Sequence, residues 1–411
     1  MKKALILTVG TGTGSETDIV KPLVKTIENS NPDFTAFLVS STSRNNAEMI
    51  VEEAGLEKSA YHIEQVPDEN DLEVVFKTSN EVIRKLMKRG FPCDKIAVDY
   101  TSGTKAMTGG LVLSAVSNNC GELKYITGKR DPNKKIVISG TEKHLSFAPS
   151  AIFAYRETQL AQQFIRDYRF SAALELLKTI NPALLDEYEN RLIENLKFAA
   201  KAYQFWDKFD HACFRGEYSK IKFDQPELID FKISAETKKR IAGITQSMKQ
   251  KEISEDILAD LYNNALRRIE EGKFDDAVAR LYRLTEMLAQ WDLKNFGISS
   301  SDVDLEKVPA SLRPELETCR DDRDGKIKIG LKKAYSILVR LGSDLGKNFS
   351  EHKNIRGLLE YRNNSILAHG LEPVEEKECR SLMNQLHDLL SSNVPEFKNR
   401  VQDLRFPWTG P

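Results

Sequence analysis

The character of the sequence changes near residue 150, and this change constrains the fold more than any other feature. Before it, short apolar runs alternate with amphipathic helical patterns. After Pro149 the strand patterns stop and helical patterns remain. A chain of 411 residues has room for two or three domains. We therefore expect an N-terminal α/β domain followed by all-helical structure.

The N-terminal part has the order of a parallel α/β sheet. Helical patterns over residues 16–29, 44–54, 71–89 and 104–117 separate the first five predicted strands. Strands that alternate with helices lie parallel and are covered on both faces, so the pattern predicts a Rossmann-like layer domain over residues 1–150. The predicted strands cover residues 3–9, 35–40, 60–66, 95–100, 123–127 and 135–139.

Polar loops of small residues follow three of these strands, at residues 10–15, 40–45 and 99–105. The carboxyl ends of parallel strands are where such sheets bind ligands. Backbone N–H groups at a helix N-terminus, hydroxyl groups and Lys105 together suit the phosphates of a nucleotide. Ordinary strand-to-helix turns also use glycine for tight backbone and serine or threonine as helix caps, so a purely structural role stays open.

The glycine spacing argues against two common nucleotide sites. Gly10, Gly12 and Gly14 lack the G-x-G-x-x-G spacing of a dinucleotide site, and no acidic residue follows the second strand to hold a ribose. Gly103 and Lys105 are not adjacent, as the glycine and lysine of a P-loop must be. A nicotinamide-cofactor enzyme is therefore not expected.

The run Asp99-Tyr100-Thr101-Ser102-Gly103-Thr104-Lys105-Ala106-Met107 resembles the D-x-T-x-G-T-K-x-M segment of CARF domains. These are the Rossmann-like sensors of CRISPR-associated proteins. The resemblance covers residues 1–150 and implies a dimer that binds a cyclic oligoadenylate across its twofold axis. Lys105 would face a phosphate, whereas Asp99 would order its loop, because a bare carboxylate repels phosphates. The implied ligand-site residues are Thr11, Gly12, Thr13, Ser41, Thr42, Asp99, Thr101, Gly103, Thr104, Lys105 and Met107.

A second constellation stands at residues 361–370, at the end of a helical pattern. Apolar residues keep the spacing of one helix face through residues 355–366, and Arg362 and His369 occupy the remaining positions of that face. The two are seven residues apart, which corresponds to about 10 Å along a helix. Buried polar groups need partners. Either the arginine pairs with a neighbouring carboxylate while the histidine caps the last turn, or the pair handles a phosphate.

The phosphate alternative describes a metal-free ribonuclease site. Arg362 would hold the scissile phosphate and stabilise its growing charge. His369 would take the 2′-hydroxyl proton or protonate the leaving oxygen. Because one helix holds the pair too far apart to serve one phosphate, two copies that cross on a twofold axis would have to share a cleft. The spacing therefore predicts a homodimer.

Arg362, Asn363 and His369 also resemble the signature of the HEPN ribonuclease family. That signature is an arginine, usually followed by a polar residue, then a histidine after four to six residues; six intervene here. The resemblance implies an all-helical HEPN bundle over residues 256–411, with Arg362, Asn363 and His369 as catalytic residues and no metal. Residues 151–255 would then form an all-helical connector, and residues 397–411 look like a tail.

The combined layout is similar to the ancillary ribonucleases of type III CRISPR antiviral systems. It implies cleavage of single-stranded RNA by a homodimer, with cyclic tetra- or hexa-adenylate as the allosteric activator and no other cofactor. A further hypothesis is that the sensor degrades its own activator. The alternative is a non-catalytic protein that responds to a cyclic nucleotide and binds RNA or regulates a partner.

The overall composition limits which partners and which cellular location we expect for the protein. A formal net charge of −1 gives no global basic field that would coat long nucleic acid. The cysteines are scattered without C-x-x-C spacing, which favours reduced thiols in a cytoplasmic protein. No apolar run approaches membrane-spanning length, so no membrane partner is expected. The C-terminal third has no short basic recognition helix followed by a β-wing pattern, so DNA is not expected as a partner either.

Overall fold

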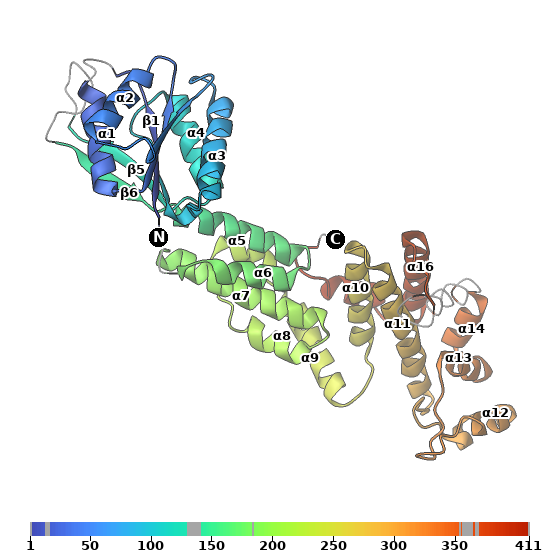
Figure 1. Ribbon diagram of the computed structural model, residues 1–411. Helices are drawn as coiled ribbons and strands as arrows, with labels where there is room; N and C mark the ends of the chain where they lie inside the picture. The colour runs from blue at the N-terminus through green and yellow to red at the C-terminus, as the bar shows by residue number, and fades with distance from the viewer. Residues whose placement is uncertain are drawn as a thin grey trace. The chain divides into compact units, whose positions relative to one another are not determined.

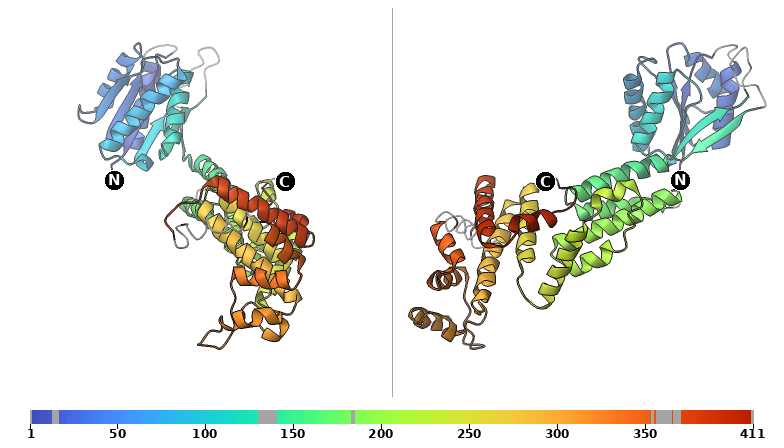
Figure 2. Two further views of the ribbon diagram at one scale, coloured as in Figure 1. Left: turned by 90° about the vertical axis from the view of Figure 1, so that its right-hand side faces the viewer. Right: turned by 180° about the vertical axis from the view of Figure 1, so that it is seen from behind.

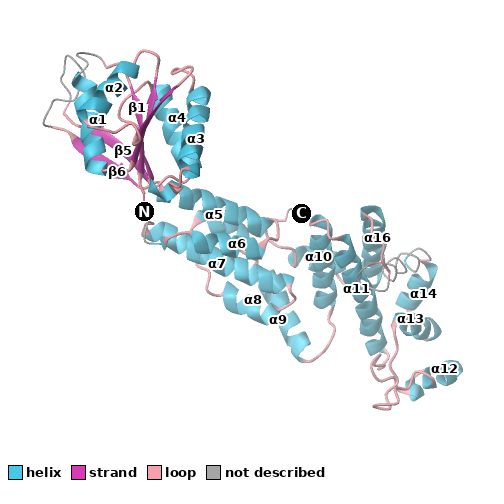
Figure 3. Ribbon diagram, viewed as in Figure 1, coloured by secondary structure: helices cyan, strands magenta, loops and turns pink. Residues whose placement is uncertain are grey.

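The computed structural model describes residues 2–12, 17–129, 141–182, 185–352, 355, 365 and 370–409. The chain forms two compact units, Met1–Glu157 with Ile180–Asp186 and Thr158–Thr179 with Glu187–Pro411 (Figures 1 and 2). Among the described residues, the sheet belongs to the first unit and the second unit is helical (Figure 3). The predicted fold class, an α/β domain followed by helical structure, is confirmed. The finer division of the helices at residues 255 and 256 stays a prediction.

The sheet has the strand order β3-β2-β1-β4-β5-β6. The central strand β1 (Ala4–Val9) pairs with β2 (Phe34–Val39) and with β4 (Ile96–Asp99), and β3 (Tyr61–Gln65) and β5 (Glu122–Thr127) continue outward. All of these pairings are parallel. Each of the five strands begins and ends within about one residue of its predicted bounds, because local apolar runs define a buried parallel strand.

Helices cover both faces of the sheet (Figure 1). The pair α1 (Thr17–Ser30) and α2 (Arg44–Glu53) covers one face, and α3 (Leu72–Lys88) and α4 (Lys105–Ser117) cover the other. Successive side chains of a strand point to opposite faces, so β1 contributes to both cores. Its Ile6 packs in the cluster of α3 and α4, whereas its Leu7 packs in the cluster of α1 and α2.

The edge strand β6 (Lys143–Phe147) corrects the prediction of a wholly parallel sheet. It pairs with β5 in the antiparallel direction, and its residues are exposed. A parallel neighbour needs a crossover connection, usually a helix. The sequence between the two strands contains Gly128, Pro132 and Gly140, which disfavour a helix. The strand predicted at residues 135–139 lies outside the described residues.

The helical unit contains a large aromatic core. Tyr203, Trp206, Phe214 and Phe231 are buried there, and the ring of Phe406 lies 5.0 Å from the rings of both Tyr203 and Trp206. The unit begins within α5 (Ser150–Arg166) and continues with α6 (Phe170–Thr179), α7 (Glu187–Asp207), α8 (His211–Tyr218), α9 (Ala235–Lys249), α10 (Glu255–Glu270), α11 (Phe274–Asn295), α12 (Arg313–Glu317), α13 (Leu331–Arg340), α14 (Asp344–Glu351), α16 (Glu376–Asn393) and α17 (Phe397–Asp403).

Residues 397–409 belong to this core, so the interpretation of residues 397–411 as a tail was wrong. Helix α17 packs on α10, and Phe406 is 1% exposed. The indole Nε1 of Trp408 donates a hydrogen bond of 3.1 Å to the carbonyl oxygen of Arg166. Leu404, Phe406 and Trp408 stand at alternate positions, and this spacing of large apolar side chains was the available signal in the sequence.

Candidate functional site

Two of the predicted ligand loops meet where the strand order reverses. The loop after β1 and the loop after β4 follow neighbouring strands whose helices lie on opposite faces of the sheet. In open α/β sheets this switch point is the usual ligand site. The third loop, residues 40–45, follows β2 and lies next to the loop after β1. The topology therefore brings the three loops to one edge of the sheet.

The loops after β1 and β4 are joined directly. The backbone N–H of Gly10 donates to Ser102 Oγ at 3.0 Å, and the Thr8 hydroxyl donates to the Ser102 carbonyl oxygen. A Cβ atom on Gly10 would lie 2.9 Å from the backbone nitrogen of Gly103, so the two backbones approach too closely for any side chain there. Asn46 Nδ2 donates to the Gly10 carbonyl oxygen at 2.9 Å, which attaches the start of α2 to the same junction.

Asp99 lies beneath this junction and is fully buried. Its carboxylate accepts a 2.8 Å bond from the backbone N–H of Thr101 and a 3.0 Å bond from the hydroxyl of Thr26 in α1. Burial raises the pKa of Asp99, and the hydrogen bonds from Thr101 and Thr26 act in the opposite direction. The side chain of Asp99 thus holds the loop after β4 in place, through the backbone of Thr101 and through Thr26 of α1.

Several of the predicted ligand residues have structural partners. The Thr101 hydroxyl accepts from the Ile126 backbone N–H at 2.9 Å. The Thr104 hydroxyl accepts from the Met107 N–H at 3.1 Å, as a cap of α4, and donates to the Glu69 carbonyl oxygen. Met107 is buried in the sheet core. These residues shape the loop and set the position of the α4 N-terminus.

The remaining predicted ligand residues that the structure describes are available to solvent. Lys105 is the first residue of α4, where backbone N–H groups without helical partners attract anions. The Ser40 hydroxyl lies 3.0 Å from the Thr42 hydroxyl, within a small serine and threonine cluster. Thr13 lies outside the described residues. The exposed set is Thr11, Gly12, Ser41, Thr42, Gly103 and Lys105.

Some residues that build this edge were not predicted from the sequence. Ser102 belongs to the run of residues 99–107, and Asn46 directly follows the loop of residues 40–45. Their positions in the sequence were therefore a weak indication that they belong to this edge of the sheet. Thr26 is 73 residues from Asp99, and no sequence spacing links the two. The rings of Tyr100 and Tyr125 stack 5.2 Å apart beside the loop, another contact between distant residues.

The predicted catalytic residues Arg362, Asn363 and His369 lie outside the described residues. The residues that follow them are attached to the start of α11. The backbone N–H of Val374 lies 3.4 Å from both carboxylate oxygens of Asp275, and the Cys379 thiol lies 3.8 Å from the carbonyl oxygen of Phe274. The chain just after the motif is thus joined to the first turn of α11.

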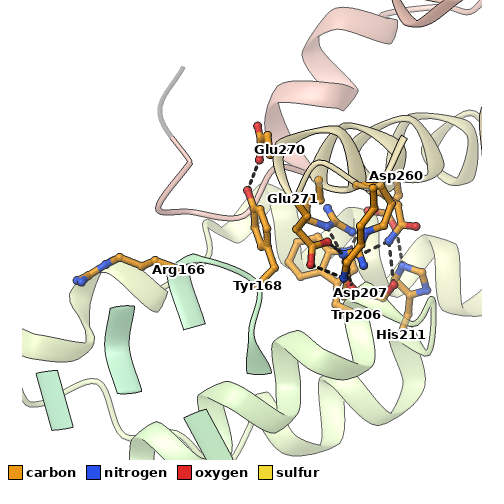
Figure 4. Close-up of polar contacts among 12 residues, drawn as sticks. Arg166, Tyr168, Trp206, Asp207, His211, Asp260, Glu270 and Glu271 are labelled. Carbon is orange, nitrogen blue, oxygen red and sulfur yellow. Dashed lines mark hydrogen bonds and ion pairs between the residues drawn. The ribbon is translucent and has the colours of Figure 1, made fainter. Parts of the chain in front are cut away.

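A buried polar network that the sequence analysis missed joins α7 and α8 to α10 (Figure 4). Asp260 is fully buried and accepts bonds from Trp206 Nε1 at 2.8 Å and from His211 Nε2 at 2.7 Å. Asp207 binds Arg267 at 2.9 Å and Arg268 at 2.7 Å. Because these side chains pair with one another and are almost wholly removed from solvent, we assign the network a structural role.

Among the residues that the structure describes, no group of three or more histidine, cysteine, aspartate or glutamate side chains is arranged to hold a metal ion. No helix in the described ranges combines the length and the apolar character that crossing a membrane requires.

The structure places this chain in the class of proteins that join a Rossmann-like α/β unit to a helical unit. Residues 245–393 match the family model described as the Csm6 HEPN domain. Csm6 from Enterococcus italicus, in a structure bound to cyclic hexa-2′-fluoro-hexa-dAMP, aligns over 98% of this chain and 99% of its own, with a TM-score of 0.58 and 13% identity. These findings confirm, for the fold, the resemblance to CARF–HEPN proteins that the sequence predicted.

Two other solved structures align over about half of the chain. Can2 from Sulfobacillus thermosulfidooxidans, in complex with cyclic tetra-adenylate, is 12% identical over 51% of this chain and 67% of its own. A type III CRISPR defence DNA nuclease activated by cyclic oligoadenylate is 14% identical over 56% of this chain and 32% of its own. Both have a TM-score of 0.25. Comparison with curated protein sequences gives no match.

Proposed function

We propose that this protein is a cyclic-oligoadenylate-activated endoribonuclease of type III CRISPR antiviral defence that cuts single-stranded RNA without a metal ion. The observation that carries the proposal is the match of residues 245–393 to the Csm6 HEPN domain, since this range includes the arginine and histidine of the motif. The same proposal makes residues 1–150 the sensor, residues 151–255 the connector and residues 256–411 the HEPN domain. The protein would act in the cytoplasm as a homodimer.

Arg362, Asn363 and His369 would form the catalytic site together with the same residues of a second copy. His369 of one copy would take the 2′-hydroxyl proton, and the freed oxygen would attack the neighbouring phosphorus. As the bond between phosphorus and the 5′-oxygen breaks, His369 of the second copy would protonate that oxygen. Arg362 would stabilise the charge that grows on the phosphate. The products would be a 2′,3′-cyclic phosphate and a 5′-hydroxyl. Unpaired RNA suits this reaction, because a stacked duplex resists the in-line geometry.

The activator would bind the loops that follow β1, β2 and β4. Lys105 at the N-terminus of α4 and the exposed hydroxyls of Thr11, Ser41 and Thr42 support this position, because they offer positive charge and hydrogen-bond donors to phosphates. The cyclic adenylate analogue in the similar Enterococcus structure supports the ligand class. A ligand shifts the enzyme toward its active form only if it binds that form more tightly than the resting one.

A fluorogenic single-stranded RNA tests the proposal. Cleavage should begin on addition of cyclic tetra- or hexa-adenylate, continue in EDTA, and disappear in Arg362→Ala and His369→Ala. If RNA is bound but not cut with either activator, the protein is instead a non-catalytic RNA-binding regulator. If the double variant cuts as fast as the parent, the catalytic assignment is wrong.

The sensor would also degrade its own activator slowly. The double variant Arg362→Ala/His369→Ala separates this activity from the HEPN site. Cyclic tetra- and hexa-adenylate incubated with it should give linear products on chromatography. Unchanged ligand after long incubation would remove this part of the proposal and leave the ribonuclease part standing.

A further inference from the structure

A basic cavity of about 340 Å³ lies between the end of α7 and the helices α10 and α11. Arg280 and Arg283 line it from α11, where their spacing of three residues places them on one face. Lys208 and Phe209 line it from the turn after α7. Phe209 has a φ of +65°, a left-handed conformation that is costly for a residue with a side chain. Phe209 therefore adds an aromatic residue to the lining, next to Lys208 in the sequence.

The acidic group of the cavity is already neutralised. Both carboxylate oxygens of Asp207 are bound, one by Arg267 and one by Arg268. Arg280 makes one 2.7 Å bond to Asp276, and its buried Nε has no hydrogen-bond partner among the described residues. The pKa of Arg280 is lowered, chiefly by burial. The charges of Arg268 and Arg267 lower this pKa further, and those of Asp276 and Asp207 raise it. An anion in the cavity would therefore be stabilised.

Two of the cationic side chains face solvent. Lys208 is exposed and has no ion pair in the part of the chain that the structure describes. Arg283 makes a single 3.1 Å pair with Glu286 on its own helix, and about half of its side chain is exposed. An exposed pair of this kind holds its arginine only weakly, so the remaining guanidinium N–H groups are available to a ligand.

Helix α11 lines the cavity, and the chain after the catalytic motif also contacts α11. Val374 contacts Asp275 in the first turn of α11. At 1.5 Å per residue, Arg280 and Arg283 stand about 8 and 12 Å further along that helix. The two arginines thus lie within about two helical turns of the point where the chain after the motif contacts α11. Proteins that bind single strands combine such backbone-tracking cations with aromatic rings on which bases stack.

We propose that Lys208, Arg280 and Arg283 hold a backbone phosphate of the RNA substrate outside the reacting nucleotides, with Phe209 beside the adjoining base. The inference rests on the proposed ribonuclease function and adds a substrate subsite to it. Because the contact is with a phosphate, it contributes affinity for single-stranded RNA without base preference.

Salt-dependent RNA binding tests the subsite. Anisotropy of a fluorescein-labelled single-stranded RNA would be measured in the His369→Ala background, so that the RNA is not consumed, from 50 to 300 mM NaCl. The variants are Lys208→Gln, Arg283→Gln and the two together, since both side chains are exposed and their loss leaves the fold intact. The matched control is Arg380→Gln, an exposed arginine of α16 that pairs with Glu376 four residues away.

Each lost phosphate contact should make the slope of log affinity against log salt concentration less steep by about 0.7. The double variant, which loses two contacts, should have a slope that is less steep by about 1.4. In the His369-containing enzyme the same variants should raise KM for RNA and leave kcat unchanged. An unchanged slope and KM in the double variant would overturn the subsite, while activator-dependent cleavage by the parent keeps the proposed function. A parent that neither binds nor cuts RNA would overturn both. A slope change equal to that of Arg380→Gln would show general surface charge only and also overturn the subsite.

Discussion

The change Gly10→Ala tests whether the loops after β1 and β4 must touch at the sensor edge. The new Cβ would lie 2.9 Å from the Gly103 nitrogen and 3.1 Å from the Gly103 Cα, and these backbone atoms cannot rotate away. Overpacking of this kind costs about 1–3 kcal/mol. At about 2–4 °C per kcal/mol for a unit of this size, Tm should fall by about 2–12 °C.

The same change should weaken the response to activator. Separating the loops stretches the 3.0 Å bond between the Gly10 N–H and Ser102 Oγ, so the ligand must restore the junction when it binds. If the ligand-bound loops carry about 1.4 kcal/mol more strain than the ligand-free loops, the activator concentration for half-maximal RNA cleavage rises about tenfold. The assays are thermal melting with and without cyclic tetra- or hexa-adenylate, and cleavage rate against activator concentration.

The matched control is Gly109→Ala in α4. Its Cβ would meet only Leu72 Cδ1, at 3.2 Å, and Leu72 is a flexible, exposed side chain. Alanine also favours a helix interior over glycine by about 1 kcal/mol, so this variant should melt no lower than the parent. Equal melting temperatures and equal activator responses in the two variants would refute the reasoning about the junction.

Three further outcomes follow from the contacts. Asp207→Ala removes a shared partner of the buried Arg267 and Arg268, so urea unfolding should show a loss of about 3–5 kcal/mol; a loss below 1 kcal/mol would contradict the structural role of the network. Burial raises the pKa of Asp99, so the native state holds its proton more tightly than the unfolded chain, and the free energy of unfolding should fall as pH rises from about 4 through the folded pKa. Asp99→Asn should lack this fall, and an identical pH profile would count against the raised pKa. Phe406→Ala should cost about 3–5 kcal/mol in the same unfolding assay, whereas a true tail residue would change nothing.

The local elements of the α/β unit and the position of its polar loops could be predicted from the amino-acid sequence alone. Strands β1 to β5 and helices α1 to α4 agree with their predicted bounds to within about one residue. This agreement arises because each element is defined by neighbours along the chain, through apolar runs, helix-period stripes and glycine, serine or threonine at the ends. The pairing of Arg362 with His369 came from the same kind of local spacing, and it stays a prediction.

The contacts between residues far apart in the sequence could not be predicted in this way and are seen in the folded chain. Asp99 binds Thr26, Trp206 binds Asp260, Asp207 binds two arginines of α10, and the chain end fills the aromatic core. The antiparallel direction of β6 belongs to the same group. Each of these contacts depends on how whole elements pack. A single side chain carries no periodic signal for a partner that lies dozens of residues away, so such contacts emerge only when the hydrophobic faces have been buried against one another.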